Sequence, residues 1–297
     1  MSKTNKNSLF IITFFCLTLL STVTFAQSKV LESLSFKSDI LQTDVRYSVY
    51  LPHGYDHSER LYPVVYLLNG FTGDERDWIQ FGDVQRLVDN EVASGNLPEM
   101  IIIMPDGDDR LYMNHADGSY NYQDMFMQEL IPTAENDYRI RKEKQFRGIS
   151  GLSMGGHGSL LLGLKYPKMF GAIAAYSSAV ATDEDLVNIE QRGFDNYWGR
   201  GIGRGLTGEE RLTPHHHANS VMSIVKNKNI DELNSVRIYF DCGDDDFLAV
   251  GNASLHIAMS RRGINHEYRV RDGVHDWKFW RASLPTGLKF IAQNFTR

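Results

Sequence analysis

Residues 148–166 have the sequence GISGLSMGGHGSLLLGLKY, and they decide the fold of this 297-residue chain. The part from Gly148 to Leu152 predicts a short buried strand, and the leucine-rich part from Ser153 to Tyr166 predicts a helix. The pattern Gly-x-Ser-x-Gly lies between them and is typical of a sharp turn that exposes a serine at a helix N-terminus. We therefore interpret Ser153 as a nucleophile rather than as part of an ordinary glycine-rich turn.

Strand and helix signals alternate on both sides of this turn. Continuous apolar runs predict buried parallel strands, and apolar residues at helical spacing predict the helices between them. The predicted strands are residues 45–51, 64–68, 101–104, 148–152, 171–176, 236–240 and 267–270, and the predicted helices are 84–92, 122–136, 153–166, 252–262 and 277–294. Pro132 is expected to kink or end the second of these helices. The order predicts an α/β fold with a mostly parallel central sheet and helices on both faces.

Residues 181–234 interrupt this alternation. They contain six glycines and many charged residues, and they show no clear strand signal. We expect them to form an insertion that lies over one end of the sheet rather than a second domain.

The first 26 residues have the order of a secretory signal peptide. Two lysines among residues 1–7 precede an apolar run from Ser8 to Leu20, and small residues lie before a cleavage point after Ala26. The alternative is a membrane anchor, but this run is shorter than the roughly 20 residues that span a bilayer. We therefore expect cleavage, a mature α/β domain of residues 27–297, and a secreted or periplasmic location.

The composition excludes several other classes of protein. The formal net charge is −6, which argues against nucleic acid as the main partner because phosphate binding needs a basic surface. The two cysteines cannot form a disulfide framework, and Cys16 would leave with the signal peptide. Cys242 lies in an apolar run and is interpreted as a small buried residue.

A nucleophilic serine needs a general base and an acid that orients the base. On this type of sheet the chain order is serine, acid, histidine. His275 follows the last predicted strand directly, whereas His256 lies inside a predicted helix and His266 precedes the strand. Asp246 lies beyond the glycine turn that ends the preceding strand, so we expect it to orient His275, with Asp245 as the alternative.

Acyl transfer also requires two backbone N–H groups that bind the developing oxyanion. We expect them from Met154, which follows the serine, and from Phe71, which follows Gly70 in the loop after an early strand. This chemistry needs no cofactor and no metal. Three adjacent histidines, at positions 215–217, are a possible metal motif, but on a loop they would not easily turn onto one ion.

Together these motifs resemble the "putative esterase" family of α/β-hydrolases, through residues 47–52, 62–68, 129–132, 151–156, 241–246 and 273–277. The family includes feruloyl and acetyl-xylan esterases, tributyrin-type esterases and S-formylglutathione hydrolases. The resemblance covers nearly all of residues 35–295 and implies Ser153, Asp246 and His275 as a catalytic triad. The family usually has His-Gly after the early strand, where this chain has Asn69-Gly70.

The resemblance implies a serine carboxylic-ester hydrolase that works through an acyl-enzyme. Together with export, it favours feruloyl or acetyl groups that decorate plant polysaccharides or their fragments. The expected partner is a small-molecule or oligosaccharide ester, with no nucleic acid and no membrane span after signal removal. The alternatives are a short-chain acyl esterase, a siderophore esterase, or a non-catalytic carbohydrate-binding protein of the same fold. Six aromatic residues could stack on substrate, or could pack in the core instead: Trp78, Tyr112, Tyr120, Tyr122, Tyr197 and Trp198.

Overall fold

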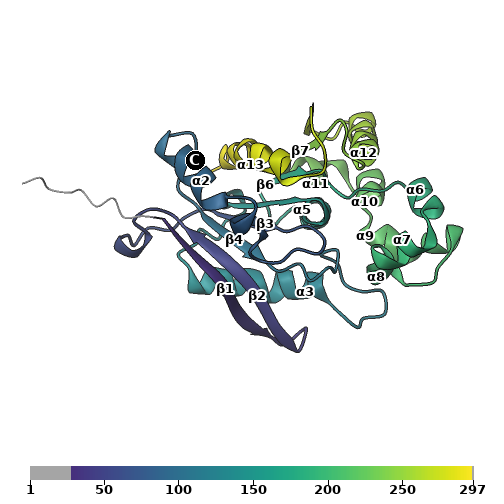
Figure 1. The fold of residues 1–297 in the computed structure, drawn as a ribbon, viewed down its shortest axis with the longest axis horizontal. Helices are drawn as coiled ribbons and strands as arrows, with labels where there is room; N and C mark the ends of the chain where they lie inside the picture. Colours follow the sequence, from purple (N-terminus) through teal and green to yellow (C-terminus); the bar gives the residue numbers. More distant parts are fainter. Residues whose placement is uncertain (1–27, 296–297) are drawn as a thin grey trace, which may run out of the picture.

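The computed structural model describes residues 28–295, which Figure 1 draws as a coloured ribbon. The predicted signal peptide, residues 1–26, lies outside the described residues together with Cys16. Within the described part of the chain, no helix combines the length and the apolar composition needed to cross a bilayer.

One sheet of eight strands forms the centre of the molecule. The strands are β1 (Lys29–Ser38), β2 (Thr43–Leu51), β3 (Val64–Leu68), β4 (Ile101–Pro105), β5 (Arg147–Leu152), β6 (Ala172–Tyr176), β7 (Arg237–Gly243) and β8 (Glu267–Arg271). Their spatial order is β1-β2-β4-β3-β5-β6-β7-β8. β2 pairs antiparallel with both β1 and β4, and all the other pairs are parallel. The prediction of a mostly parallel sheet is confirmed.

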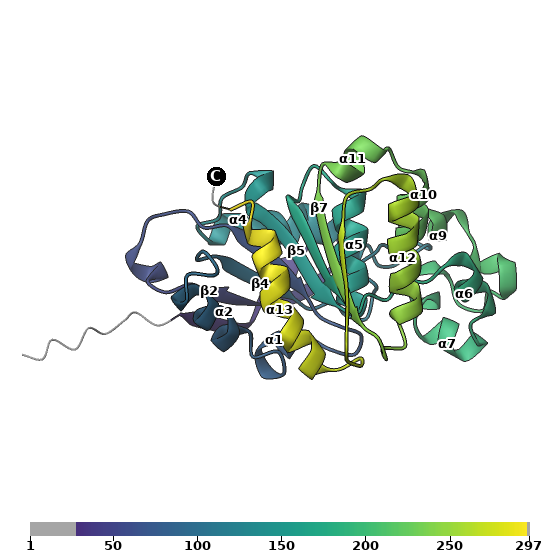
Figure 2. The same cartoon turned by 90° about the horizontal axis from the view of Figure 1, so that it is seen from above.

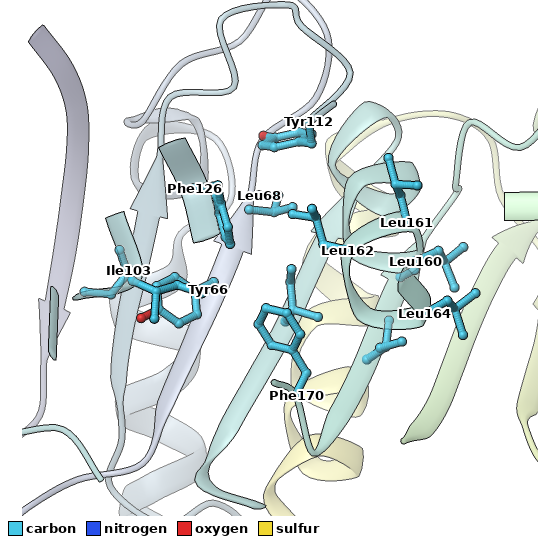
Figure 3. Packing of buried hydrophobic residues seen from close by; sticks show 14 of the residues in the cluster. Tyr66, Leu68, Ile103, Tyr112, Phe126, Leu160, Leu161, Leu162, Leu164 and Phe170 are labelled. Atoms are coloured by element: carbon cyan, nitrogen blue, oxygen red, sulfur yellow. The ribbon is translucent and has the colours of Figure 1, made fainter. Parts of the chain in front are cut away.

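The central strands are buried on both faces because successive side chains of a strand point to opposite sides. In β3, Tyr66 and Leu68 belong to one apolar cluster, and Val65 and Leu67 belong to the cluster on the other face. Figure 3 shows Tyr66 and Leu68 packed close to Phe126. A strand of this kind has no polar positions, which explains the continuous apolar runs in the sequence.

Two layers of helices cover the sheet. The layer on the Tyr66 face contains α3 (Tyr122–Met125), the π-helical turn η2 (Phe126–Leu130), α4 (Ile131–Asp137), α5 (Met154–Lys165), α10 (Val221–Asn227) and α12 (Ala249–Arg262). The other layer contains α1 (Asp77–Gln80), α2 (Val84–Ala93) and α13 (Trp277–Ala292). Figure 2 shows α13 crossing in front of the strands. Three short 3-10 turns lie in loops: η1 (Tyr55–His57), η3 (Lys144–Phe146) and η4 (Gly208–Arg211).

Residues 181–234 form the expected insertion. Its helices are α6 (Asp183–Asn188), α7 (Gln191–Asn196), α8 (Gly199–Ile202), α9 (Pro214–Asn219), α10 and α11 (Ile230–Asn234), and no strand lies between residues 181 and 234. Figures 1 and 2 show α6 and α7 at one side of the molecule, beyond α12. The last part of the insertion differs from the expectation, because α10 packs against α5 and α12 within the helix layer.

Two elements differ from the sequence prediction. β1 was not predicted, since half of its ten residues are exposed and its pairing with β2 shifts register between Leu31 and Leu34. The expected helix over 122–136 is continuous, but it widens into the π-helical turn just before Pro132. Proline cannot donate a backbone hydrogen bond and crowds the preceding turn, and a wider turn accommodates both effects.

Candidate active site

Ser153 lies in the sharp turn between β5 and α5, at the carboxyl end of the central strands. Its backbone angles, φ 53° and ψ −114°, are rare for a residue with a side chain. Two hydrogen bonds hold this conformation: the Ser153 N–H donates to the Tyr176 carbonyl at 2.9 Å, and the Ser153 carbonyl accepts from the Ala179 N–H at 3.0 Å. The serine is thus fixed by the end of β6 and by the loop that follows it.

The glycines around Ser153 are needed for space. A Cβ atom at Gly155 would lie 2.5 Å from the Leu68 carbonyl oxygen, and a Cβ atom at Gly151 would lie 2.6 Å from the backbone of Gly155. Such distances do not occur between real atoms of this kind, so the turn could not form with larger residues. The expected strand, tight turn and helix are confirmed.

The structure brings the three predicted site residues together. The Nε2 atom of His275 lies 3.0 Å from Ser153 Oγ. The Nδ1 atom of the same ring lies 2.8 Å and 3.0 Å from the two carboxylate oxygens of Asp246. The alternative acid, Asp245, is exposed. The other two late histidines contact each other instead: Nδ1 of His256 lies 2.8 Å from Nε2 of His266.

Asp246 is buried, with 4% of its surface exposed, and its charge is nevertheless favoured. Burial opposes ionisation, but the hydrogen bonds from His275 and from the Leu248 N–H outweigh it and lower the pKa of Asp246. An ionised carboxylate at Nδ1 makes this nitrogen the donor, which leaves Nε2 of His275 free to accept a proton from Ser153. The arrangement is suited to general-base activation of a serine hydroxyl.

The loop after β3 approaches Ser153 closely. A Cβ atom at Gly70 would lie 2.8 Å from Leu152 Cδ1, so a larger residue there would force the Leu152 side chain to shift. Phe71 follows Gly70 and lines the same cavity as Ser153. Met154 is the first residue of α5, where a backbone N–H has no acceptor within the helix. The two expected oxyanion donors therefore lie on the two segments that flank the serine.

Asn69 fixes the conformation of this loop. Its side-chain nitrogen donates to the Gly70 carbonyl at 3.0 Å, and its side-chain oxygen accepts from the Gly107 N–H at 2.9 Å and from the Tyr112 hydroxyl at 2.7 Å. The Gly70 carbonyl and the Phe71 N–H share one planar peptide group, so a bond to the first also sets the direction of the second. The residue that departs from the family pattern is thus a buried anchor of the loop.

A cavity of about 680 Å³ opens next to Ser153 and His275. The loop of Phe71 forms part of its wall, and the insertion contributes Tyr197 and Trp198. The rings of Phe71 and Tyr197 pack edge to face with their centroids 5.1 Å apart. The lining is mainly apolar and aromatic, which suits a substrate with a flat apolar group.

The six aromatic residues considered for stacking have different positions. Tyr197 and Trp198 line the cavity, whereas three others are fully buried in the core: Trp78, Tyr112 and Tyr122. Phe247, which no sequence pattern singled out, is 76% exposed and lies with its ring centroid 4.5 Å from the ring of His275. Its position directly after Asp246 was the only available signal.

Cys242 is fully buried, as expected. Burial raises the pKa of its thiol to about 12, so the nucleophilic thiolate is absent near neutral pH. The thiol is therefore not a competing nucleophile.

Comparison with known proteins agrees with this geometry. The family model described as "Putative esterase" matches residues 38–291. The chain belongs to this family. It is 27% identical to an acetyl esterase of Caldicellulosiruptor saccharolyticus over 77% of this chain and 83% of that protein. It is also 30% identical to an endo-1,4-beta-xylanase/feruloyl esterase of Xylanibacter ruminicola, over 47% of this chain and 20% of that longer protein.

Two solved structures show how far the similarity extends in three dimensions. A ferulic acid esterase superimposes with a TM-score of 0.77 and 33% identity, covering 91% of this esterase and all of that chain. An S-formylglutathione hydrolase from Staphylococcus aureus has the same fold, with a TM-score of 0.72 and 19% identity over 90% of this chain and 99% of that one. The esterase is a carboxylic ester hydrolase with the α/β-hydrolase fold.

Proposed function

We propose that Ser153 is the nucleophile of this esterase, that His275 is its general base and acid, and that Asp246 orients the imidazole. The observation that carries the proposal is the hydrogen-bonded line from Ser153 Oγ through His275 to Asp246, which ends in a large cavity. The backbone N–H groups of Phe71 and Met154 are proposed to bind the oxyanion.

The reaction has two halves. Ser153 Oγ attacks the ester carbonyl carbon while its proton moves to Nε2 of His275. The bond to the alcohol then breaks, the alcohol takes that proton, and an acyl-serine remains. In the second half, water attacks the acyl carbon with the same histidine as base, the acid leaves, and the serine hydroxyl is restored.

The cavity favours an aromatic acyl group. Its volume of about 680 Å³ is far larger than an acetyl group needs, and Phe71, Tyr197 and Trp198 offer aromatic surface. We therefore propose feruloyl groups attached to plant polysaccharides or their fragments as the substrate class. The similarity to proteins named feruloyl esterase supports this choice. Acetyl groups are the second candidate, supported by the relative named acetyl esterase.

We further propose that the mature enzyme acts outside the cytoplasm, where such polysaccharides are found. The support for export is the sequence of residues 1–26. Sequencing the N-terminus of the protein recovered outside the cytoplasm would test this, with Gln27 expected as the first residue.

A substrate panel with matched variants tests the proposal. The panel contains methyl ferulate, acetylated xylan, a short-chain nitrophenyl ester and a catecholate siderophore ester. We expect methyl ferulate to give the highest kcat/KM, and Ser153→Ala to lower kcat by roughly 10⁴- to 10⁶-fold. The control Ser94→Ala removes an exposed hydroxyl at the end of α2 and should have no effect.

Two results would contradict the proposal. Undiminished turnover by a folded Ser153→Ala variant would overturn the assignment of the nucleophile. A wild-type preference for the nitrophenyl ester or the siderophore would leave that assignment intact but would overturn the substrate class.

A further inference from the structure

Three metal-ligating side chains meet in the insertion. Asp183 is the first residue of α6, and His216 and His217 lie next to each other on α9. Each offers one ligand atom, and the three atoms all lie within 4.8 Å of one another. The chain separates Asp183 from the histidines by more than 30 residues, so folding brings the cluster together.

The three adjacent histidines do not act as a unit. They lie on a helix rather than on the expected loop, and their rings point to different partners. Nε2 of His215 contacts the Asn114 carbonyl at 2.9 Å, outside the cluster. The third ligand comes instead from Asp183, which the sequence pattern could not indicate.

His216 is held firmly in place. It is 5% exposed, and its backbone N–H donates to Thr213 Oγ1 at 3.0 Å in the cap of α9. Its Nε2 lies 3.1 Å from Asp183 Oδ1.

His217 is exposed, and its Nδ1 lies 3.2 Å from Ser223 Oγ. A contact of this kind fixes the orientation of a ligating ring while the other nitrogen binds the ion. We therefore assign Nε2 of His217 to the metal.

The donor set selects the kind of ion. Two imidazoles and a carboxylate suit zinc and its neighbours in the first transition series, whereas calcium and magnesium prefer oxygen ligands. Zinc–ligand bonds of about 2.0–2.1 Å place tetrahedral ligand atoms about 3.4 Å apart. The 3.1 Å between His216 and Asp183 is already close to this separation. The separations from His217 are at most 4.8 Å, so a small movement of this exposed ring would complete the geometry.

We propose that Asp183, His216 and His217 form a binding site for one divalent transition-metal ion such as zinc, with water as the fourth ligand. The ion would tie the start of α6 to α9. Ala181 lies two residues before Asp183 and lines the cavity, and α6 contributes Asp185 and Asn188 to the same wall. The site therefore has a structural role: it holds one wall of the substrate cavity.

Zinc binding can be measured directly on the full chain. The protein is freed of metal with a chelator and titrated with zinc chloride in a calorimeter. We expect wild type to bind one zinc ion, and His217→Ala and Asp183→Asn to bind it at least tenfold more weakly. Both substitutions replace exposed side chains, and circular dichroism verifies that the variants are folded. Zinc should also raise the Tm of wild type and not that of His217→Ala.

Two control variants locate the site. His57→Ala removes an exposed histidine elsewhere, and His256→Ala breaks the other pair of imidazoles, so both should bind zinc like wild type. If His217→Ala and Asp183→Asn bound zinc as tightly as wild type, the proposal would be wrong. Binding that is lost only in His256→Ala, or a wild type that takes up no zinc at about 1 mM, would overturn it equally.

Discussion

The serine turn and the insertion are built in opposite ways. Every residue of β5 is buried, and so is every residue of α5 from Met154 to Leu164. The part of the insertion before α10, residues 181–219, consists of helices of four to six residues and has a small apolar cluster of its own. Packing on all sides sets the position of Ser153, whereas this part of the insertion has little core with which to set its shape.

In the insertion, hydrogen bonds of polar side chains set the shape instead. The buried guanidinium of Arg211 donates to the carbonyls of Leu186 at 2.9 Å, Ile189 at 2.7 Å and Leu206 at 3.0 Å. Thr182 closes a capping box at the start of α6. The serine turn and the cavity wall are thus stabilised separately, and a change in one need not disturb the other.

The largest difference between the two regions should appear in stability. Leu162→Ala removes a fully buried side chain from α5 and should lower the free energy of unfolding by roughly 2–5 kcal/mol. Ile202→Ala removes a side chain from the small cluster of the insertion and should mainly loosen the cavity wall, which raises KM. Urea unfolding and steady-state kinetics of both variants measure the contrast. Equal shifts of the urea midpoint would show that the insertion unfolds together with the sheet.

The contact between the two regions should respond to acid. The ring of His157 in α5 packs against Trp198 of the insertion with centroids 5.4 Å apart, and burial lowers the pKa of His157 to about 4. Between this value and the ordinary pKa near 6.5, the unfolded chain binds a proton that the folded chain excludes, so stability falls as the pH falls. The loss attributable to His157 is about 3 kcal/mol across this range.

Urea unfolding at pH 7 and pH 4.5 tests this, with His157→Gln as the comparison. The variant should lose less stability on acidification than wild type, because it lacks the imidazole of His157. Some loss should remain, because the other titrating groups are unchanged. The same pH dependence in both proteins would show that another group is responsible.

The smallest effect is expected in the loop after β3. Asn69→Ala removes one of the two hydrogen bonds to the Gly70 carbonyl, leaves only the longer one from the Gly73 N–H at 3.3 Å, and so loosens the Phe71 peptide. We expect kcat to fall about tenfold, or about 1.4 kcal/mol, with KM nearly unchanged, because oxyanion binding matters in the transition state. The control is Asn96→Ala, which replaces an exposed side chain just after α2. A rise in KM with kcat intact would mean that Asn69 shapes the cavity instead.

The sequence predicted those parts of the fold and site in which the local residue pattern follows directly from burial in the sheet. The continuous apolar runs, the glycines around Ser153 and the chain order of Ser153, Asp246 and His275 all follow from one sheet topology. The structure places these three side chains within hydrogen-bond distance, and their catalytic roles stay a prediction. The bulge in β1 hid that strand, because it breaks the alternation on which strand prediction depends.

Long-range neighbours were beyond prediction. Phe247 lies against His275 because the loops after the neighbouring strands β7 and β8 meet, and Asp183 meets His216 because the start of α6 lies beside α9. No periodic pattern and no motif in the sequence indicates either contact. The sequence also could not show that Trp78 and Tyr112 are buried in the core while Tyr197 lines the cavity. All three are aromatic residues near glycines, and only their long-range neighbours differ.

The spacing of the site along the chain determines when it can be assembled. Ser153 and His275 are 122 residues apart, and the histidine follows the edge strand β8. During synthesis, the serine turn and the whole insertion leave the ribosome before β8 and the loop that carries His275. A nascent or truncated chain that stops after β7 therefore holds the serine without the proposed base. With the proposed roles, activity requires the last strand to join the sheet and the chain to be translated at least through His275.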